Sequence, residues 1–394
     1  MWKNKNIWIV LIGEFVVGLG LWAGIIGNLA FMQTLVPSDF HKSIILAAGM
    51  LAGVLIGPMA GRMIDTYSKR TVLLASSAGR IISVSFMFIA LWTNSIIWML
   101  AFLISLQLCA AFFMPALQAI IPMIAKEDEL LTLNGWHMNA RTVSRIVGTA
   151  AAGLMLSYLD LKWLYISSFI VYIAMFGILM LLKLEEKTQG EHRQKERGSF
   201  KEVWPMLKEY PVVLTTLVLT IIPVLFLGSF NLVVINLTEI HASAGLSGVL
   251  YTVEGIGFML GAFFIKRISE RINTGTMLFT AAFAMGFLDL SLYLSGIKPI
   301  VIFTFASFGF LVGCFYPVAV TIFQRQVPKE FHGRFFSFRN MFDQLLFQIV
   351  LLSTGALLDL LGVQFVGVVF GVLSLAMTLY FFIQINAKQI KIVS

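Results

Sequence analysis

Residues 57–70 read GPMAGRMIDTYSKR and separate two long apolar stretches of the chain. The upstream stretch, residues 43–61, contains no Asp, Glu, Lys or Arg, and residues 71–92 contain only Arg80. A helix needs about 20 predominantly apolar residues to cross the hydrocarbon core of a bilayer. Both stretches are long enough, so we expect residues 57–70 to include the polar connection between two membrane-spanning helices.

The overall composition agrees with this interpretation. Of the 394 residues, 59% are hydrophobic and 12% are charged, and the mean hydropathy is +0.90. Soluble domains have about 25% charged residues, so the composition excludes an ordinary soluble globular protein. A disordered chain is excluded too, because 13% of the residues are aromatic.

Twelve apolar stretches are expected to be membrane-spanning helices, which predicts an all-α membrane protein. We assign the N-terminal six-helix bundle to residues 1–182 and the C-terminal six-helix bundle to residues 211–394. The first stretch is too long for a cleavable signal peptide. The helices are predicted at residues 7–36, 43–61, 71–92, 95–122, 133–156, 163–182, 211–236, 244–265, 275–296, 299–324, 335–358 and 365–386.

The distribution of basic residues predicts the orientation in the membrane. With both termini on the cytoplasmic side, the cytoplasmic segments hold 21 Lys and Arg residues, and the outer loops hold only Lys42, Lys162 and Lys298. Positive residues accumulate in cytoplasmic loops. This explains the net charge of +8 without a nucleic-acid partner, and it places the protein in the cell inner (cytoplasmic) membrane with both termini inside.

Residues 183–210 are expected to be a cytoplasmic linker between the bundles. Residues 183–209 contain 7 basic and 6 acidic residues and no long apolar run, and a short amphipathic helix is expected at their end. The flanking halves look like distant parallel repeats, an architecture in which transporters bind substrate near the membrane midplane between the repeats. The matches, 200 to 203 residues apart, are Gly57 with Gly257, Gly61 with Gly261, Pro115 with Pro317 and Asn28 with Asn231.

The polar segment at 57–70 resembles the signature loop of the major facilitator superfamily, with its glycines, aspartate, arginine and paired basic residues. The segment FMPALQAIIP at 113–122, followed by Leu130 and Asn134, resembles the branch of that family that contains bacterial macrolide and siderophore exporters. Three segments of the second half resemble the same branch: residues 327–328, 333–334 and 355–359.

The resemblance implies a fold of two pseudo-symmetric bundles that export a small amphipathic compound in exchange for protons by alternating access. The implied substrates are an antibiotic, including a self-made peptide antibiotic such as bacilysin, a drug, or a siderophore. Two positions depart from the family. Thr66 stands where an arginine is usual, and Thr149 follows Gly148 where antiporters have proline.

The signature loop is predicted to be a conformational latch. Small residues four apart allow a neighbouring helix to approach closely. The resemblance implies that Asp65 holds the outward-facing state, and we expect it to dock near residues 334–340, where a helix N-terminus stabilises an exposed carboxylate by about 0.3–1 kcal/mol. The alternative is a solvated loop carboxylate. The predicted latch residues are Gly57, Gly61, Asp65, Lys69 and Arg70.

Eight ionisable residues fall within the predicted helices. Each charge at the membrane centre costs about 2.5–3.5 kcal/mol on insertion scales, so such residues usually form pairs or line water, and they are the first candidates for function. The family resemblance makes the helices of Arg80 and Asp289 peripheral supports, and Arg339 can reach the interface. The eight residues are Glu14, Arg80, Arg141, Arg145, Glu254, Asp289, Arg339 and Asp343.

Three carboxylates are the candidates for proton coupling: Glu14, Glu254 and Asp343. Glu14 shares a stripe with Gly18 and Asn28, each about 40° away around the helix, and the stripe is expected to face the central cavity. Glu254 lies halfway along its helix among Tyr251 and glycines. A buried, isolated carboxylate favours its neutral form, which suits a site that binds and releases a proton. Plain ion pairs between helices are the alternative.

Four further residues are candidates for contacts with substrate or as counter-ions. Arg141 and Arg145 are four residues apart and share one helix face, and Asn28 and Asn231 add neutral polar groups to corresponding helices. A helix-packing role is the alternative for Asn28.

No motif for catalysis, a metal or a cofactor occurs. There is no nucleotide-binding GxxxxGK[ST] loop and no HExxH motif, the five histidines are scattered, and Cys109 and Cys314 are two lone thiols. We therefore expect no enzyme activity, no cofactor and no metal. The expected partners are the lipid bilayer, a small-molecule substrate and protons, for a monomer. Two alternatives stay open: a proton-coupled nutrient importer and a non-transporting scaffold or receptor.

Overall fold

A computed structural model describes residues 2–125, 129–184, 203–243, 245–328 and 332–387. These residues form helices and short connections, with no strand among them. Ten of the helical segments are long and apolar enough to cross a membrane. Large apolar side chains lie on the surface, among them Leu55, Trp92 and Leu360 with 79%, 86% and 78% of their area exposed. Such a surface requires an apolar surrounding, so the predicted all-α membrane protein is confirmed.

The helices follow the predicted stretches closely. In the first half they are α1 (Lys5–Leu35), α2 (Asp39–Thr66), α3 (Lys69–Thr93), α4 (Ile96–Ile124), α5 (Leu130–Tyr158) and α6 (Leu161–Met180). The second half contains α7 (Val203–Glu209), α8 (Pro211–Leu219), α9 (Ile221–Ile240), α10 (Leu246–Ser269), α11 (Thr274–Ser291), α12 (Lys298–Gln326) and α13 (His332–Ala387). The short α7 is the helix expected at the end of the linker.

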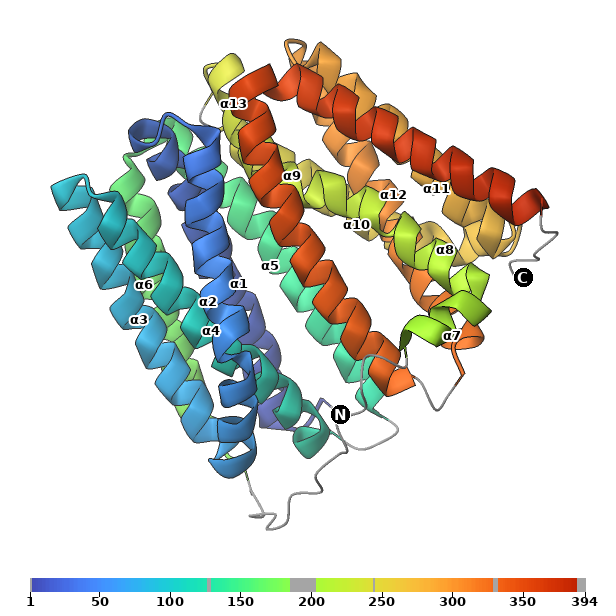
Figure 1. Ribbon diagram of the computed structural model, residues 1–394. Helices are drawn as coiled ribbons and strands as arrows, with labels where there is room; N and C mark the ends of the chain where they lie inside the picture. Colours follow the sequence, from blue (N-terminus) through green and yellow to red (C-terminus); the bar gives the residue numbers. More distant parts are fainter. Residues whose placement is uncertain (1, 126–128, 185–202, 244, 329–331, 388–394) are drawn as a thin grey trace. The chain divides into compact units, whose positions relative to one another are not determined.

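Two membrane spans are divided differently from the prediction. The seventh span consists of α8 and α9, which meet at Thr220 but cross as one segment, Pro211–Ile240. The last two predicted helices run on as α13, whose 56 residues contain one non-helical position, Gly362 (φ 76°, ψ 169°). That conformation is open almost only to glycine, and α13 changes direction there (Figure 1). Dividing α13 at Gly362, and adding the more polar α5 to the ten apolar segments, is consistent with twelve spans.

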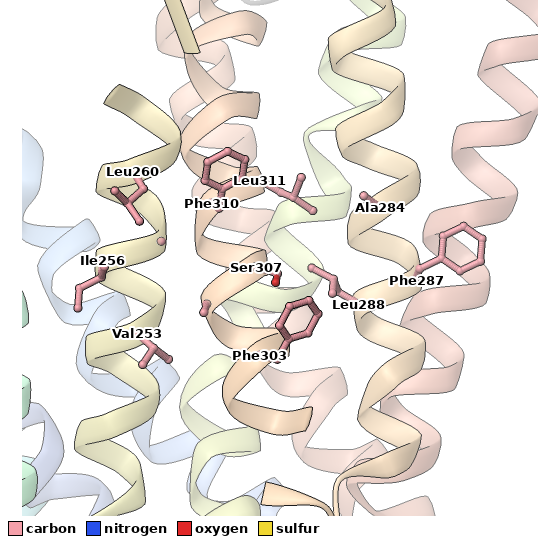
Figure 2. A pocket seen from close by; sticks show the side chains of 12 residues that line it. Val253, Ile256, Leu260, Ala284, Phe287, Leu288, Phe303, Ser307, Phe310 and Leu311 are labelled. Carbon is pink, nitrogen blue, oxygen red and sulfur yellow. The ribbon is translucent and has the colours of Figure 1, made fainter. Parts of the chain in front are cut away.

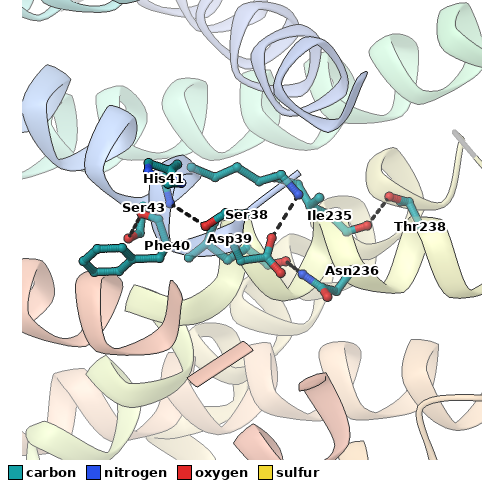
Figure 3. A network of polar contacts seen from close by, with 10 residues as sticks. Ser38, Asp39, Phe40, His41, Ser43, Ile235, Asn236 and Thr238 are labelled. Atoms are coloured by element: carbon teal, nitrogen blue, oxygen red, sulfur yellow. Dashed lines mark hydrogen bonds and ion pairs between the residues drawn. The ribbon is translucent and has the colours of Figure 1, made fainter. Parts of the chain in front are cut away.

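The start of α2 shows why sequence-based boundaries fell short (Figure 3). Ser38 caps the helix by accepting a hydrogen bond from the amide of His41 at 3.2 Å. Lys42, counted above as an outer-loop residue, lies in the first turn and is buried, with its Nζ 2.9 Å from Oδ1 of Asp39. Pairing lets a charged residue lie inside the helix end, so α2 begins four residues before the apolar run.

Residue contacts divide the chain into two compact units. The first contains residues 1–190 and 242–252, and the second contains residues 191–241 and 253–394. Within the first unit, α1 packs against α5 and α6, α3 packs against α4 and α6, and α2 packs against α4 (Figure 1). The predicted bundles and linker, 1–182, 183–210 and 211–394, remain an expectation.

Glycines bring α10 and α12 of the second unit together. A Cβ atom added to Gly257 would collide with the carbonyl oxygen of Ala306, and one added to Gly309 would collide with that of Glu254. Small residues at four-residue spacing permit this close approach of helix backbones in membranes. The matching residue of the first half, Gly57, has nothing within 4 Å of such an atom, so the repeated glycines have different roles in the two halves.

This difference predicts opposite effects of one substitution. Gly257→Ala is expected to lower the free energy of unfolding, because overpacking costs about 1–3 kcal/mol and the helix propensity of alanine returns at most about 1 kcal/mol. Gly57→Ala meets no atom and is expected to keep or raise stability. Thermal unfolding of the purified variants in detergent measures both. Equal midpoints for the two variants would show that the α10–α12 contact is not as close as described.

Candidate functional site

A buried carboxylate and a buried imidazole face each other across α1 and α5. Oε2 of Glu14 lies 3.5 Å from Nε2 of His137, and the two residues expose 3% and 7% of their area. Neither atom has a hydrogen-bond partner among the described residues. The pair therefore brings a carboxylate together with an imidazole, the type of side chain most used for proton exchange near neutral pH.

Arg80 of α3 is the fixed cation near this pair. It exposes 4% of its area, and its guanidinium carbon lies 4.4 Å from the ring centre of Phe113 and 6.0 Å from that of Tyr172. It interacts electrostatically with Glu14. Ring faces attract a desolvated cation with about 2 kcal/mol or more. Arg80 was predicted to be structural, and its stacking agrees with a role in holding α3, α4 and α6 together.

A second cluster lies farther along the α1–α5 interface. The guanidinium carbon of Arg145 is 5.6 Å from the ring centre of Trp22, whose ring lies 5.9 Å from that of Tyr251. The hydroxyls of Thr149 and Thr252 are 3.2 Å apart. The cluster combines a cation, two aromatic rings and two hydroxyls, which are groups that can bind an amphipathic molecule.

Small residues hold these helices close. A Cβ on Gly18 of α1 would collide with Ser144 of α5, and a Cβ on Gly153 of α5 would meet the Cα of Gly248 at 2.8 Å. Residue 248 belongs to the part of α10 that lies in the first unit. The stripe of Gly18 that was expected to face a cavity therefore includes a helix-packing contact.

Asn28 also contacts a neighbouring helix. Its Oδ1 accepts a hydrogen bond of 2.9 Å from the hydroxyl of Tyr165 on α6, and it exposes 4% of its area. A substrate role for Asn28 stays a prediction, as it does for the half-buried Asn231 and for the exposed Arg141.

The acidic candidates of the second unit differ in their surroundings. Oδ2 of Asp343 lies 3.5 Å from Nε of Arg339, one turn away on α13, so the predicted interfacial Arg339 has a partner within its own helix. Glu254 exposes 2% of its area. Asp289, predicted to be structural, accepts a hydrogen bond of 3.4 Å from Ser374 between α11 and α13.

The predicted latch is described only in part. The side chains of Gly61, Asp65 and Arg334 lie outside the described residues, so docking of Asp65 stays a prediction. Arg70 donates a hydrogen bond of 2.9 Å to the carbonyl oxygen of Met180, which ties the start of α3 to the end of α6.

A groove of about 690 Å³ lies between α10, α11 and α12 in the second unit (Figure 2). Apart from the hydroxyl of Ser307, its twelve lining residues have apolar side chains or none. Ile256, Leu260, Phe287 and Phe303 on its wall expose 43–67% of their area. The groove offers no group that binds a proton or an ion, so it does not contribute to the charged clusters.

No functional role was predicted from the sequence for His137, Trp22 or Tyr251. Histidines were set aside because they are scattered along the chain. A signal was nevertheless present: His137 lies four residues before Arg141 and eight before Arg145, and therefore on a related face of the same helix. Among the described residues, no group of three or more His, Cys, Asp or Glu side chains could hold a metal ion.

The sequence profile of the Major Facilitator Superfamily matches residues 10–238 and 226–392. The chain belongs to this superfamily, and it is a multi-pass membrane transporter of the secondary class. Members of the family are carriers and not enzymes.

Relatives and solved structures agree. The chain is 26% identical over 391 residues to the MFS-type transporter YfiS of Bacillus subtilis (strain 168), covering 94% of this chain and 91% of the relative. It is 24% identical over 346 residues to macrolide efflux protein A of Streptococcus pyogenes, covering 80% of each. Its fold matches a mutant of the nucleoside transporter NupG with a TM-score of 0.76 at 12% identity, covering 96% of this chain and 99% of that one.

Proposed function

We propose that the protein exports a small amphipathic compound, an antibiotic, drug or siderophore, in exchange for protons. The similarity to macrolide efflux protein A supports export as the direction of transport, because it extends over 80% of both chains and is not limited to one motif. These relatives do not favour the importer alternative, and a scaffold would leave the buried ionisable residues without a purpose.

The geometry supports the same proposal. Trp22, Tyr251 and Arg145 form a cluster of two aromatic rings and one cation, a combination that suits a molecule with apolar and polar parts. Glu14 and Glu254 are carboxylates with 3% and 2% exposure within membrane-spanning helices, and ionisable groups inside such helices commonly mark proton relays.

In this proposal the two halves alternate access to a site near the midplane, in a monomer with cytoplasmic termini in the cell membrane. Coupling requires that the proton and the substrate favour different conformations of the protein. The free energy by which the proton weakens substrate binding then equals the free energy by which the substrate weakens proton binding. The latch formed by Gly57, Gly61, Asp65, Lys69 and Arg70 would stabilise one of these states.

Everted membrane vesicles test the proposal. With radiolabelled erythromycin as the probe, vesicles containing the protein are expected to accumulate the probe when their lumen is acidified, and a protonophore is expected to abolish the accumulation. Vesicles from cells without the protein are the control. Accumulation that persists with the protonophore would contradict proton coupling. Absence of accumulation for erythromycin and for every compound that a deletion strain becomes sensitive to would contradict export.

A further inference from the structure

We propose that Glu14 and His137 bind the transported proton together, as one site within the first unit. This inference rests on the proposed function and identifies the residues that couple it. The two side chains come from different helices, α1 and α5, and their facing atoms are 3.5 Å apart. Both residues are buried, so neither can exchange its partner for bulk water without a movement of the helices.

Glu14 and Asp343 differ in the side chain that each carboxylate faces. Asp343 faces Arg339, which keeps its charge at any physiological pH. Glu14 faces an imidazole, a type of side chain that can gain and lose a proton, unlike a guanidinium. A pair of this kind binds a proton on Nε2 of His137 while Oε2 of Glu14 supplies the counter-charge, and it releases the proton to leave a carboxylate beside a neutral ring.

The surrounding charges favour release of the proton. Arg80 on α3 is the fixed cation that interacts electrostatically with Glu14, and it is also near Tyr172 of α6 and Cys109 of α4. Arg141, one turn beyond His137 on α5, is exposed. Without the proton, Glu14 and Arg80 balance each other. With the proton on His137, the imidazolium adds one positive charge beside the carboxylate of Glu14, so proton binding changes the net charge inside the bundle.

Aromatic residues place the pair near one membrane surface. The ring centre of Trp2 lies 5.3 Å from that of Trp8 in a tilted contact and 5.5 Å from that of Trp136 in an edge-to-face contact, and all three residues are exposed. Tryptophan gathers at the membrane–water interface. Glu14 lies six residues beyond Trp8, which corresponds to about 9 Å at 1.5 Å per residue. In the proposed orientation this is the cytoplasmic side, so a proton released from the pair has a short path to the cytoplasm.

The same two helices connect the pair to the aromatic cluster. Trp22 follows Glu14 by eight residues on α1, and Arg145 follows His137 by eight residues on α5. Eight residues rise by about 12 Å, so the pair and the cluster are two contacts of one helix interface, with Gly18 and Ser144 in close contact between them.

Proton counting tests the pair without any substrate. The purified full chain in detergent is titrated between about pH 5 and 8. His137→Gln and Glu14→Gln are each expected to bind one proton fewer than the wild type, and the double variant is expected to lose no further proton, because a buried imidazole without its counter-charge stays neutral. Losses that add in the double variant, or no loss in Glu14→Gln, would overturn the proposal. The control is His41→Gln, which removes an exposed histidine. The number of protons lost through this change should be the same with and without Glu14→Gln.

Transport measurements show whether a negative result contradicts this inference or the proposed function. In proteoliposomes with erythromycin as the probe, His137→Gln and Glu14→Gln are expected to reduce uptake driven by a pH gradient at least about tenfold, the effect of a coupling free energy within the usual range, and to keep counterflow, which needs no net proton movement. If both variants keep gradient-driven uptake that a protonophore abolishes, the proposed function stands and the assignment to this pair is overturned. Loss in Glu254→Gln alone would overturn it in the same way.

Discussion

Arg80→Gln is expected to lower the free energy of unfolding by about 2 kcal/mol or more, the value of a desolvated contact between a cation and a ring face. Arg80 exposes 4% of its area, stacks on Phe113 at 4.4 Å and interacts electrostatically with Glu14. The variant loses the ring contact and leaves the carboxylate of Glu14 without its fixed cation. Thermal and denaturant unfolding of the purified protein in detergent measure the change.

A double variant identifies the cause. Arg80→Gln with Glu14→Gln is expected to recover part of the stability, since the second change removes the carboxylate that the first leaves uncompensated. Arg141→Gln is the matched control, because Arg141 is exposed on α5 and its change is expected to cost less than about 1 kcal/mol. If Arg80→Gln and Arg141→Gln unfold alike, Arg80 does not stabilise the first unit.

Arg145→Ala is expected to reduce the initial rate of erythromycin export about 30-fold. A desolvated cation–ring contact is worth about 2 kcal/mol, and each 1.4 kcal/mol corresponds to a factor of about ten. The contact in question is that between Arg145 and Trp22, at 5.6 Å. Initial uptake rates in everted vesicles, normalised to the amount of protein, measure the effect, and Trp22→Ala is expected to match it.

Arg145→Lys measures how much the planar shape of the guanidinium contributes to the export rate. Lysine keeps the charge but lacks the planar group that lies over the ring. The expected rate of this variant lies between those of the wild type and Arg145→Ala. Arg325→Ala, at the exposed end of α12, is the control for loss of a basic residue and should export at the wild-type rate. Equal rates for Arg145→Ala and the wild type would remove Arg145 from the substrate site.

The membrane class and the helices were predictable because hydropathy acts along the chain. Residues 95–122 became α4, Ile96–Ile124, and residues 299–324 became α12, Lys298–Gln326. The continuity of α13 was missed, since the backbone angles of Gly362 depend on how two helices pack and not on the apolar content around them. The start of α2 was missed because Lys42 is paired with Asp39, and a pair cannot be seen in a hydropathy average.

The candidate site was predictable only as a set of residues. The sequence indicated Glu14 and Arg145 because an ionisable residue in a membrane helix is costly wherever it lies. It did not indicate His137, 123 positions from Glu14, because the distance between their side chains depends on the packing of α1 against α5. It placed Asn28 on a cavity stripe, although its oxygen faces Tyr165 of α6.

By itself the sequence determined that this chain crosses a membrane many times and which ionisable residues must be accommodated there, since the transfer of each residue from water to lipid depends mainly on its own chemistry. Only the tertiary structure decided which of these residues meet. Close helix contacts, such as that of Gly18 with Ser144, bring together side chains that lie far apart in the chain. Packing places an imidazole beside Glu14 and an arginine beside Asp343, and this difference is the basis on which we propose Glu14 for proton binding.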